Sequence, residues 1–138
     1  MIPRPYEVLP HTADTGIATS ADTLGEVIAN AAFGMFALMY DVGGNPATTS
    51  LELDVEAGTP AELLLEVLAE LLFHAEVDDT AYGGFAVDTD GLHASVTAQG
   101  IPSDGLELLG PPIKAVTYHD LRCEQVEDHW EARVIFDV

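Results

Sequence analysis

The chain has 138 residues, of which 48% are apolar, and this size suits one domain with its own core. Its charge is unusual, because 24 acidic residues face only 4 basic residues, which gives a formal net charge of -20. Four cations are too few for a basic surface that replaces phosphate counterions, so we expect no direct binding of nucleic acid. The acidity fits docking on a basic partner or a solvated surface tuned to a salty cytoplasm, and the sequence leaves both open.

The sequence points to a cytoplasmic protein without a membrane anchor. Cys123 is the only cysteine, which excludes an internal disulfide and suits a reducing compartment. Residues 1–5 lack the apolar core of a signal peptide, and the longest apolar run, residues 31–40, is too short to span a bilayer.

The first third of the chain predicts two short strands and a helix. Residues 6–9 and 17–20 are expected strands, separated by a polar turn at residues 11–16. Thr23 and Glu26 have the spacing of a capping box, which predicts a helix that begins after Thr23. Apolar residues then recur at helical spacing as far as Met39, and glycines at 43 and 44 end the pattern.

The middle of the chain predicts one strand and a second helix. Apolar and acidic residues alternate over residues 51–57, as in a half-buried strand. Thr59 and Glu62 form a second capping box, with Pro60 at the first helical position. The helix that follows carries a leucine stripe, and Leu63 and Val67 widen it enough to predict cover on more than one side.

The second half of the chain predicts strands. Residues 85–88 and 92–98 flank a turn at Asp90-Gly91 and predict a hairpin, and residues 99–112 read as a long loop. Residues 113–126 and 130–138 are two longer expected strands, the second with one face made of Trp130, Ala132, Val134 and Phe136. We therefore predict a single α+β domain over residues 1–138, with two layers in which a mainly antiparallel sheet packs with two amphipathic helices.

Several segments in this order resemble the archease family. The most specific segment is Ile-Lys-Ala-Val-Thr-Tyr-His at residues 113–119; the others are His-Thr-Ala-Asp at 11–14 with Gly16, and Val-Ile-Phe-Asp-Val at 134–138. Asn-Ala-Ala at 30–32 and Glu-Leu-Leu at 70–72 also match in place. The loop at residues 99–112 and the pair Val67-Leu68 depart from the family pattern, which leaves the role of that loop open.

The resemblance implies a divalent cation, with Ca²⁺ expected and Mg²⁺ or Mn²⁺ as alternatives. Its ligands would be the carboxylates of Asp14 and Asp137 and the terminal carboxylate of Val138, which suit the preference of hard cations for oxygen. Alternatively, Asp14 caps a turn and Asp137 is a solvated strand end.

Three further residues take supporting roles under the same resemblance. His11 and Glu26 would lie near the cation as outer partners, and Lys114, the only lysine, would contact a protein partner. The alternatives are a hydrogen-bonded His11, a Glu26 that only completes its capping box, and a Lys114 paired with any nearby carboxylate.

As a function, the resemblance implies a non-enzymatic accessory protein. It would activate a GTP-dependent tRNA-splicing RNA ligase by promoting guanylylation and multiple turnover of that ligase. A chaperone-like modulator of an RNA-modifying methyltransferase and a carboxylate-metal hydrolase are the alternatives. The hydrolase is weakened because no base or nucleophile can be identified in the sequence, which also has neither a phosphate-binding glycine loop nor a Gly-x-Ser-x-Gly turn. The identity of the cation, the oligomeric state and the ligase interface are left open.

Overall fold

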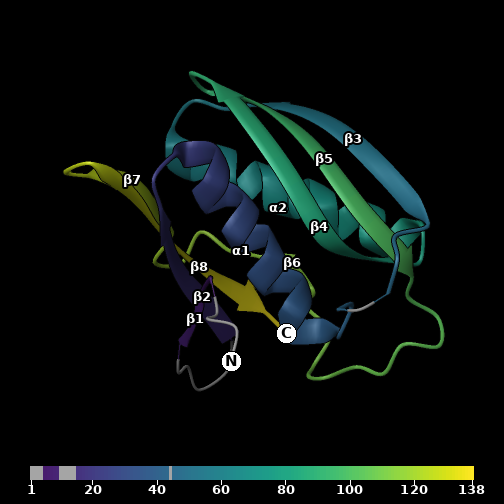
Figure 1. Ribbon diagram of the computed structural model, residues 1–138. Helices are drawn as coiled ribbons and strands as arrows, with labels where there is room; N and C mark the ends of the chain where they lie inside the picture. The colour runs from purple at the N-terminus through teal and green to yellow at the C-terminus, as the bar shows by residue number, and fades with distance from the viewer. Residues whose placement is uncertain (1–4, 10–14, 44) are drawn as a thin grey trace.

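The computed structural model describes residues 5–9, 15–43 and 45–138. In this part of the chain two helices pack with eight strands that form two antiparallel sheets (Figure 1). The predicted α+β fold, with two helices on mainly antiparallel strands, is confirmed. The strands divide into a five-stranded and a three-stranded sheet, a division that the sequence pattern did not indicate.

The five-stranded sheet is built around the last strand of the chain. One edge of β8 pairs with β2, which in turn pairs with β1. The other edge of β8 pairs first with β6 and then with β7. The bounds are β1 (Glu7–Leu9), β2 (Thr15–Ala21), β6 (Ala115–Val116), β7 (Arg122–Val126) and β8 (His129–Asp137). The predicted alternation in β8 is confirmed, because Ala132, Val134 and Phe136 are buried on one face.

The expected strand at residues 113–126 is interrupted. It pairs with β8 only at β6 and β7, and between them Leu121 N donates to Tyr118 O across 3.2 Å in a turn where Asp120 has a φ of 52°. The N–H and hydroxyl of Thr117 both donate to the Ile135 carbonyl, at 3.0 and 2.9 Å. The prediction of one continuous strand is therefore wrong at this turn.

The three-stranded sheet has the order β3-β5-β4, with bounds β3 (Thr49–Glu56), β4 (Thr80–Asp90) and β5 (His93–Pro102). The predicted hairpin is present, and Gly91 takes the positive φ of 61° that its turn requires. Both strands are longer than predicted, because a register shift between Tyr82 and Gly84 lets β4 continue to Thr80. β5 consequently includes residues 99–102, which were expected in the loop.

The two helices are capped as their sequences predict. α1 (Leu24–Met39) begins after Thr23, whose side chain accepts from Glu26 N at 3.1 Å, and α2 (Pro60–Val77) begins after Thr59, which accepts from Glu62 N at 3.1 Å. Both helices contact both sheets, and Leu63 and Val67 are fully buried, which confirms the predicted cover of α2 on more than one side. Over the described residues, neither helix has the length and apolarity that crossing a membrane requires.

Candidate functional site

The end of β8 lies between the beginnings of two neighbouring strands. Asp137 is its last residue, with an exposed side chain, and it pairs with Ala115 of β6. On the other edge, Phe136 pairs with Thr15, the first residue of β2. The carboxylate of Asp137 is therefore presented to solvent from a backbone that is fixed on both sides.

Lys114 is tied to this strand end through its main chain. Its N–H donates to the carbonyl of Asp137 across 2.7 Å, and its side chain is exposed. The preceding Ile113 is buried and donates to the sulfur of Met39 at 3.4 Å, which anchors the segment to the C-terminal end of α1. Lys114, the predicted partner contact, and Asp137, a predicted ligand, thus lie next to each other.

The remaining predicted ligands are only partly described. Val138 is half-buried and packs against the core beside Asp137. Asp14 and His11 lie outside the described residues, although Thr15, which follows Asp14 in the chain, pairs with the neighbour of Asp137. Within residues 5–9, 15–43 and 45–138, no group of three or more His, Cys, Asp or Glu side chains could hold a metal ion.

Glu26 lies far from this strand end. The pairing of β2 with β8 runs from Thr15 opposite Phe136 to Ala21 opposite Trp130, and α1 begins just beyond Ala21. Seven strand residues span about 20 Å at 3.3 Å per residue, so Glu26 lies near the other end of β8. The structure does not bring Glu26 beside Asp137. The position of Glu26 in the capping box of α1 is enough to explain why this residue is present.

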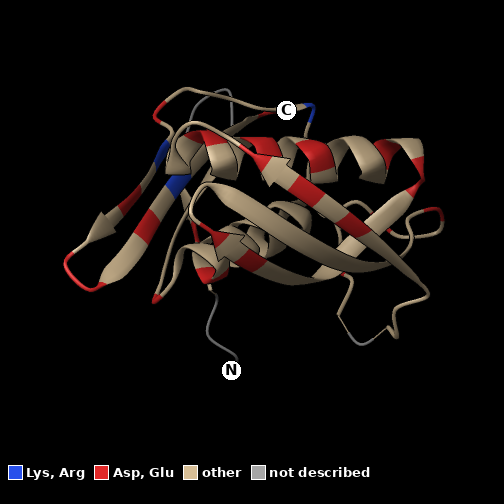
Figure 2. Ribbon diagram, turned by 90° about the horizontal axis from the view of Figure 1, so that it is seen from above, with Lys and Arg blue, Asp and Glu red and all other residues tan. Residues whose placement is uncertain are grey.

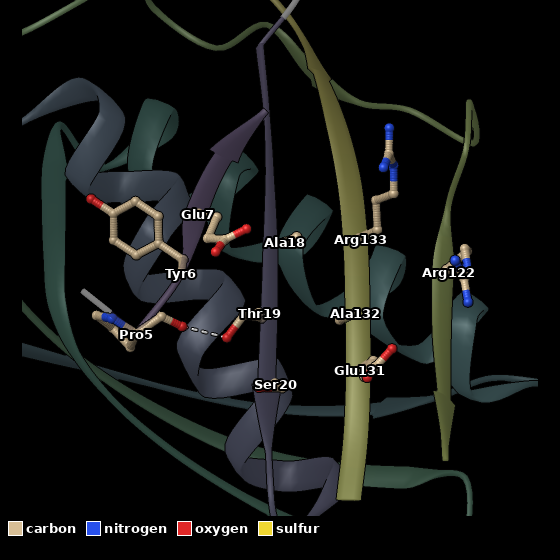
Figure 3. Close-up of a pocket in the computed structure, with 10 residues that line it drawn as sticks. All are labelled: Pro5, Tyr6, Glu7, Ala18, Thr19, Ser20, Arg122, Glu131, Ala132 and Arg133. Atoms are coloured by element: carbon tan, nitrogen blue, oxygen red, sulfur yellow. Dashed lines mark hydrogen bonds between the residues drawn. The ribbon is translucent and has the colours of Figure 1, made fainter. Parts of the chain in front are cut away.

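Away from this strand end, a concave region lies on the outer face of the five-stranded sheet (Figure 3). This groove, of about 450 Å³, lies over β2 and β8, with small residues Ala18 and Ser20 on its floor. Arg122 and Arg133, half of the basic residues in the chain, are directly opposite each other on β7 and β8. The charge count did not predict this pairing, and only the register of β7 could have indicated it.

The two arginines in this groove have carboxylate partners. Arg122 forms an ion pair with Glu124, which raises the pKa of its guanidinium further, and a terminal nitrogen of Arg133 lies 4.0 Å from Asp120. Glu131 also lines the groove. Because these carboxylates offset the two cations, the groove lacks the excess of positive charge that an anionic ligand would need.

Cys123 is a core residue. It is buried on the inner face of β7, and burial, followed by the charge of Glu124, raises the pKa of its thiol to about 12. A thiol with that pKa is protonated at neutral pH and is a poor nucleophile. Burial and the raised pKa both fit a small core residue.

The sequence profile of the archease protein family matches residues 6–138. The chain belongs to the archease family. This match includes the segment at residues 113–119 and the end of β8, the two described segments that meet at the candidate site.

Individual archeases match over almost their whole length. The archease of Methanosarcina barkeri is 34% identical, over 96% of this chain and 95% of that protein, and the archease of Methanopyrus kandleri is 30% identical, over 97% and 99%. The solution structure of protein 1598 of Methanobacterium thermoautotrophicum superposes with a TM-score of 0.82 at 30% identity, over 98% and 99% of the two chains. The crystal structure of a Thermotoga maritima archease, described as a possible chaperone, shares the fold with a TM-score of 0.66 at 20% identity, over 94% of each chain.

Proposed function

We propose that this archease is a non-enzymatic accessory protein that activates a GTP-dependent tRNA-splicing RNA ligase. In this proposal a divalent cation, Ca²⁺ in the first place, binds at the end of β8 through Asp14, Asp137 and Val138. Lys114 then contacts the ligase next to that cation. The ligase performs the chemistry, and the archease promotes its guanylylation and repeated turnover.

One observation carries the proposal, namely the hydrogen bond from Lys114 N to Asp137 O at 2.7 Å. It links two of the family segments, which are separated in the sequence, at a single exposed point. A carboxylate on a fixed backbone loses little conformational entropy when it binds a cation. A lysine beside it adds a cationic group that can contact an acidic position on a partner.

The distribution of charge supports a protein partner over RNA. The net charge is -20, and two of the four basic residues, the arginines drawn in Figure 3, are paired with the carboxylates of Glu124 and Asp120. Phosphate contacts require several free Lys or Arg side chains. An acidic surface instead favours encounter with a basic protein, at a rate that falls as salt is added.

A ligation assay tests the proposal. It uses limiting cognate ligase, excess GTP and cleaved tRNA, with wild-type archease or with Asp137→Asn. Asp128→Asn is the matched control, because Asp128 is 98% exposed in the β7–β8 turn, at the other end of β8, and the change of charge is the same. We expect activation by the wild type and by Asp128→Asn, and its loss with Asp137→Asn.

Two measurements separate the parts of the proposal. Calorimetric titration of Ca²⁺, Mg²⁺ and Mn²⁺ should show weaker binding to Asp137→Asn than to Asp128→Asn, whereas Lys114→Ala should retain the cation and lose activation. If wild-type protein leaves both ligase guanylylation and turnover unchanged, the ligase role is refuted. Prevention of methyltransferase aggregation without any ligase would then favour the chaperone alternative.

A further inference from the structure

One long edge of the three-stranded sheet has no partner in the described part of the chain. β3 forms its ladder with β5 alone, over eight consecutive residue pairs from Thr49 with Gly100 to Glu56 with His93. The ladder contains no register shift, and β3 contains no proline. Figure 1 shows β3 as the outermost strand on this side of the molecule.

The register defines which backbone groups face outward. Ala57 N donates to Leu92 O, so residues of β3 with odd numbers bond to β5, in the alternation of an antiparallel ladder. The N–H and C=O groups of Ser50, Glu52, Asp54 and Glu56 therefore point away from β5. Such a row is a template for one more strand.

The other edge of the same sheet is formed by β4, and helix α1 covers it. α1 lies along β4 so closely that a Cβ built on Gly25 would be 2.4 Å from the carbonyl oxygen of Val87. That edge is covered by a helix, which is a common protection against unwanted strand pairing. Among residues 5–9, 15–43 and 45–138 no element covers the edge of β3 in this way, and β3 itself has neither the bulges nor the prolines that close an edge.

The side chains of β3 define what could pair there. On the inner face Leu51 and Leu53 are only half-buried, because the sheet ends at this strand. On the outer face Glu52, Asp54 and Glu56 are exposed, and Figure 2 shows acidic positions along β3 and along neighbouring α2. A strand added here would bring one set of alternate side chains beside carboxylates and the other set beside leucines.

We propose that the free edge of β3 binds an extended segment of a partner protein in which Lys or Arg alternates with apolar residues. The backbone groups of residues 50–56 supply hydrogen bonds, and the two faces select the alternating sequence. The proposal does not depend on the ligase, because β3 belongs to the other sheet from Asp137.

A second copy of this chain fits the edge poorly. Antiparallel pairing of two β3 strands about Asp54 would set Asp54 opposite Asp54, and Glu52 opposite Glu56. Like charges directly opposite each other destabilise a strand pair, and each chain carries a net charge of -20. The acidic face therefore opposes self-association and favours a basic segment.

The experiment uses the full chain and synthetic peptides of eight residues. The probe alternates Lys and Val; one control has the same sequence with methyl groups on the backbone nitrogens of two central residues, one Lys and one Val, and a second control alternates Glu and Val. We expect the Lys-Val peptide to bind at least about tenfold more tightly than either control, since only it has both the charge and the backbone donors. Amide chemical-shift changes should concentrate at residues 49–56.

Variants test the position of the site. Glu52→Lys with Glu56→Lys should reverse the preference, so that the Glu-Val peptide binds more tightly than the Lys-Val peptide. Asp88→Lys with Asp90→Lys is the matched control, because it makes the same change of charge on exposed positions of β4, and it should keep the original preference. If the first variant does not fold, Glu52→Gln with Glu56→Gln should still weaken binding of the Lys-Val peptide.

Three results would overturn the proposal. The first is equal binding of the N-methylated peptide, which would mean non-specific attraction between charges. The second is a set of shifted amides outside β3. The third is self-association through β3 in sedimentation at moderate salt, which would make a second copy the occupant.

Discussion

At Gly25 the backbone of α1 lies against strand β4. The substitution Gly25→Ala tests how closely the two backbones are packed there. The added Cβ would be 2.4 Å from the carbonyl oxygen of Val87, whereas an ordinary carbon–oxygen contact is roughly 3.2 Å. Either α1 or β4 must therefore retreat by about 0.8 Å. The obstacle is backbone in a strand that is paired with β5, so it cannot rotate away as a side chain would.

Two effects of opposite sign decide the size of the loss. Overpacking a close contact costs about 1–3 kcal/mol, and the rigid obstacle places Gly25→Ala near 3 kcal/mol. Replacing a helical glycine by alanine returns about 1 kcal/mol of helix propensity. We expect the free energy of unfolding to fall by about 2 kcal/mol, which corresponds to roughly 6–8 °C in Tm for a domain of this size.

Urea unfolding followed by far-UV circular dichroism measures the change. Gly34→Ala is the control, because it makes the same substitution in the same helix but meets the side chains of Tyr6 and Ile17 at 2.9 and 3.0 Å. These side chains can adjust, so its loss should be smaller. A Gly25→Ala protein as stable as the wild type, with an unchanged m-value, would show that α1 does not lie tightly on the edge of β4.

Three further predictions concern the five-stranded sheet. Phe136→Ala should lower the free energy of unfolding by about 3–5 kcal/mol in urea titration, because Phe136 is fully buried. Cys123, with a thiol pKa of about 12, should resist iodoacetamide at pH 8 in the native protein and react in urea. The pKa of His129 is raised, chiefly by its hydrogen bond to Glu131, so Glu131→Gln should lower it in an NMR titration. The stabilisation from this raised pKa is present below about pH 6.5 and is lost as the pH rises through the folded-state pKa.

The sequence predicted the elements whose signals are local. The capping residues Thr23 and Thr59 mark both helix beginnings, and the alternation in β8 identifies its buried face. It did not predict the split into two sheets, because strand partners depend on packing between distant segments. The interruption of the strand was also missed, because the chain turns between Tyr118 and Leu121, where Asp120 takes a positive φ, and nothing in the local pattern shows this.

The candidate site was also predicted only in part, because its residues come from segments that are distant in the sequence. The family segments placed Asp137 and Lys114 at one site, and the structure joins them by a hydrogen bond. The capping spacing of Glu26 was itself the evidence against a role near the cation, since it fixes this residue at the beginning of α1. The cation and the contribution of Asp14 remain predictions that titration can test.

The central place of β8 in its sheet has a consequence for the order of folding. Residues 49–102 contain every strand of the three-stranded sheet, so that sheet can form from segments close together in the chain. The five-stranded sheet requires β2 to find β8 across nearly the whole sequence, which closes a long loop at an entropic cost. During synthesis the edge of β2 that pairs with β8 has no partner until residues 129–137 leave the ribosome. We therefore expect ribosome-bound chains that end before β8 to protect the amides of β3 to β5 from exchange, and to leave unprotected those amides of β2 that bond β8.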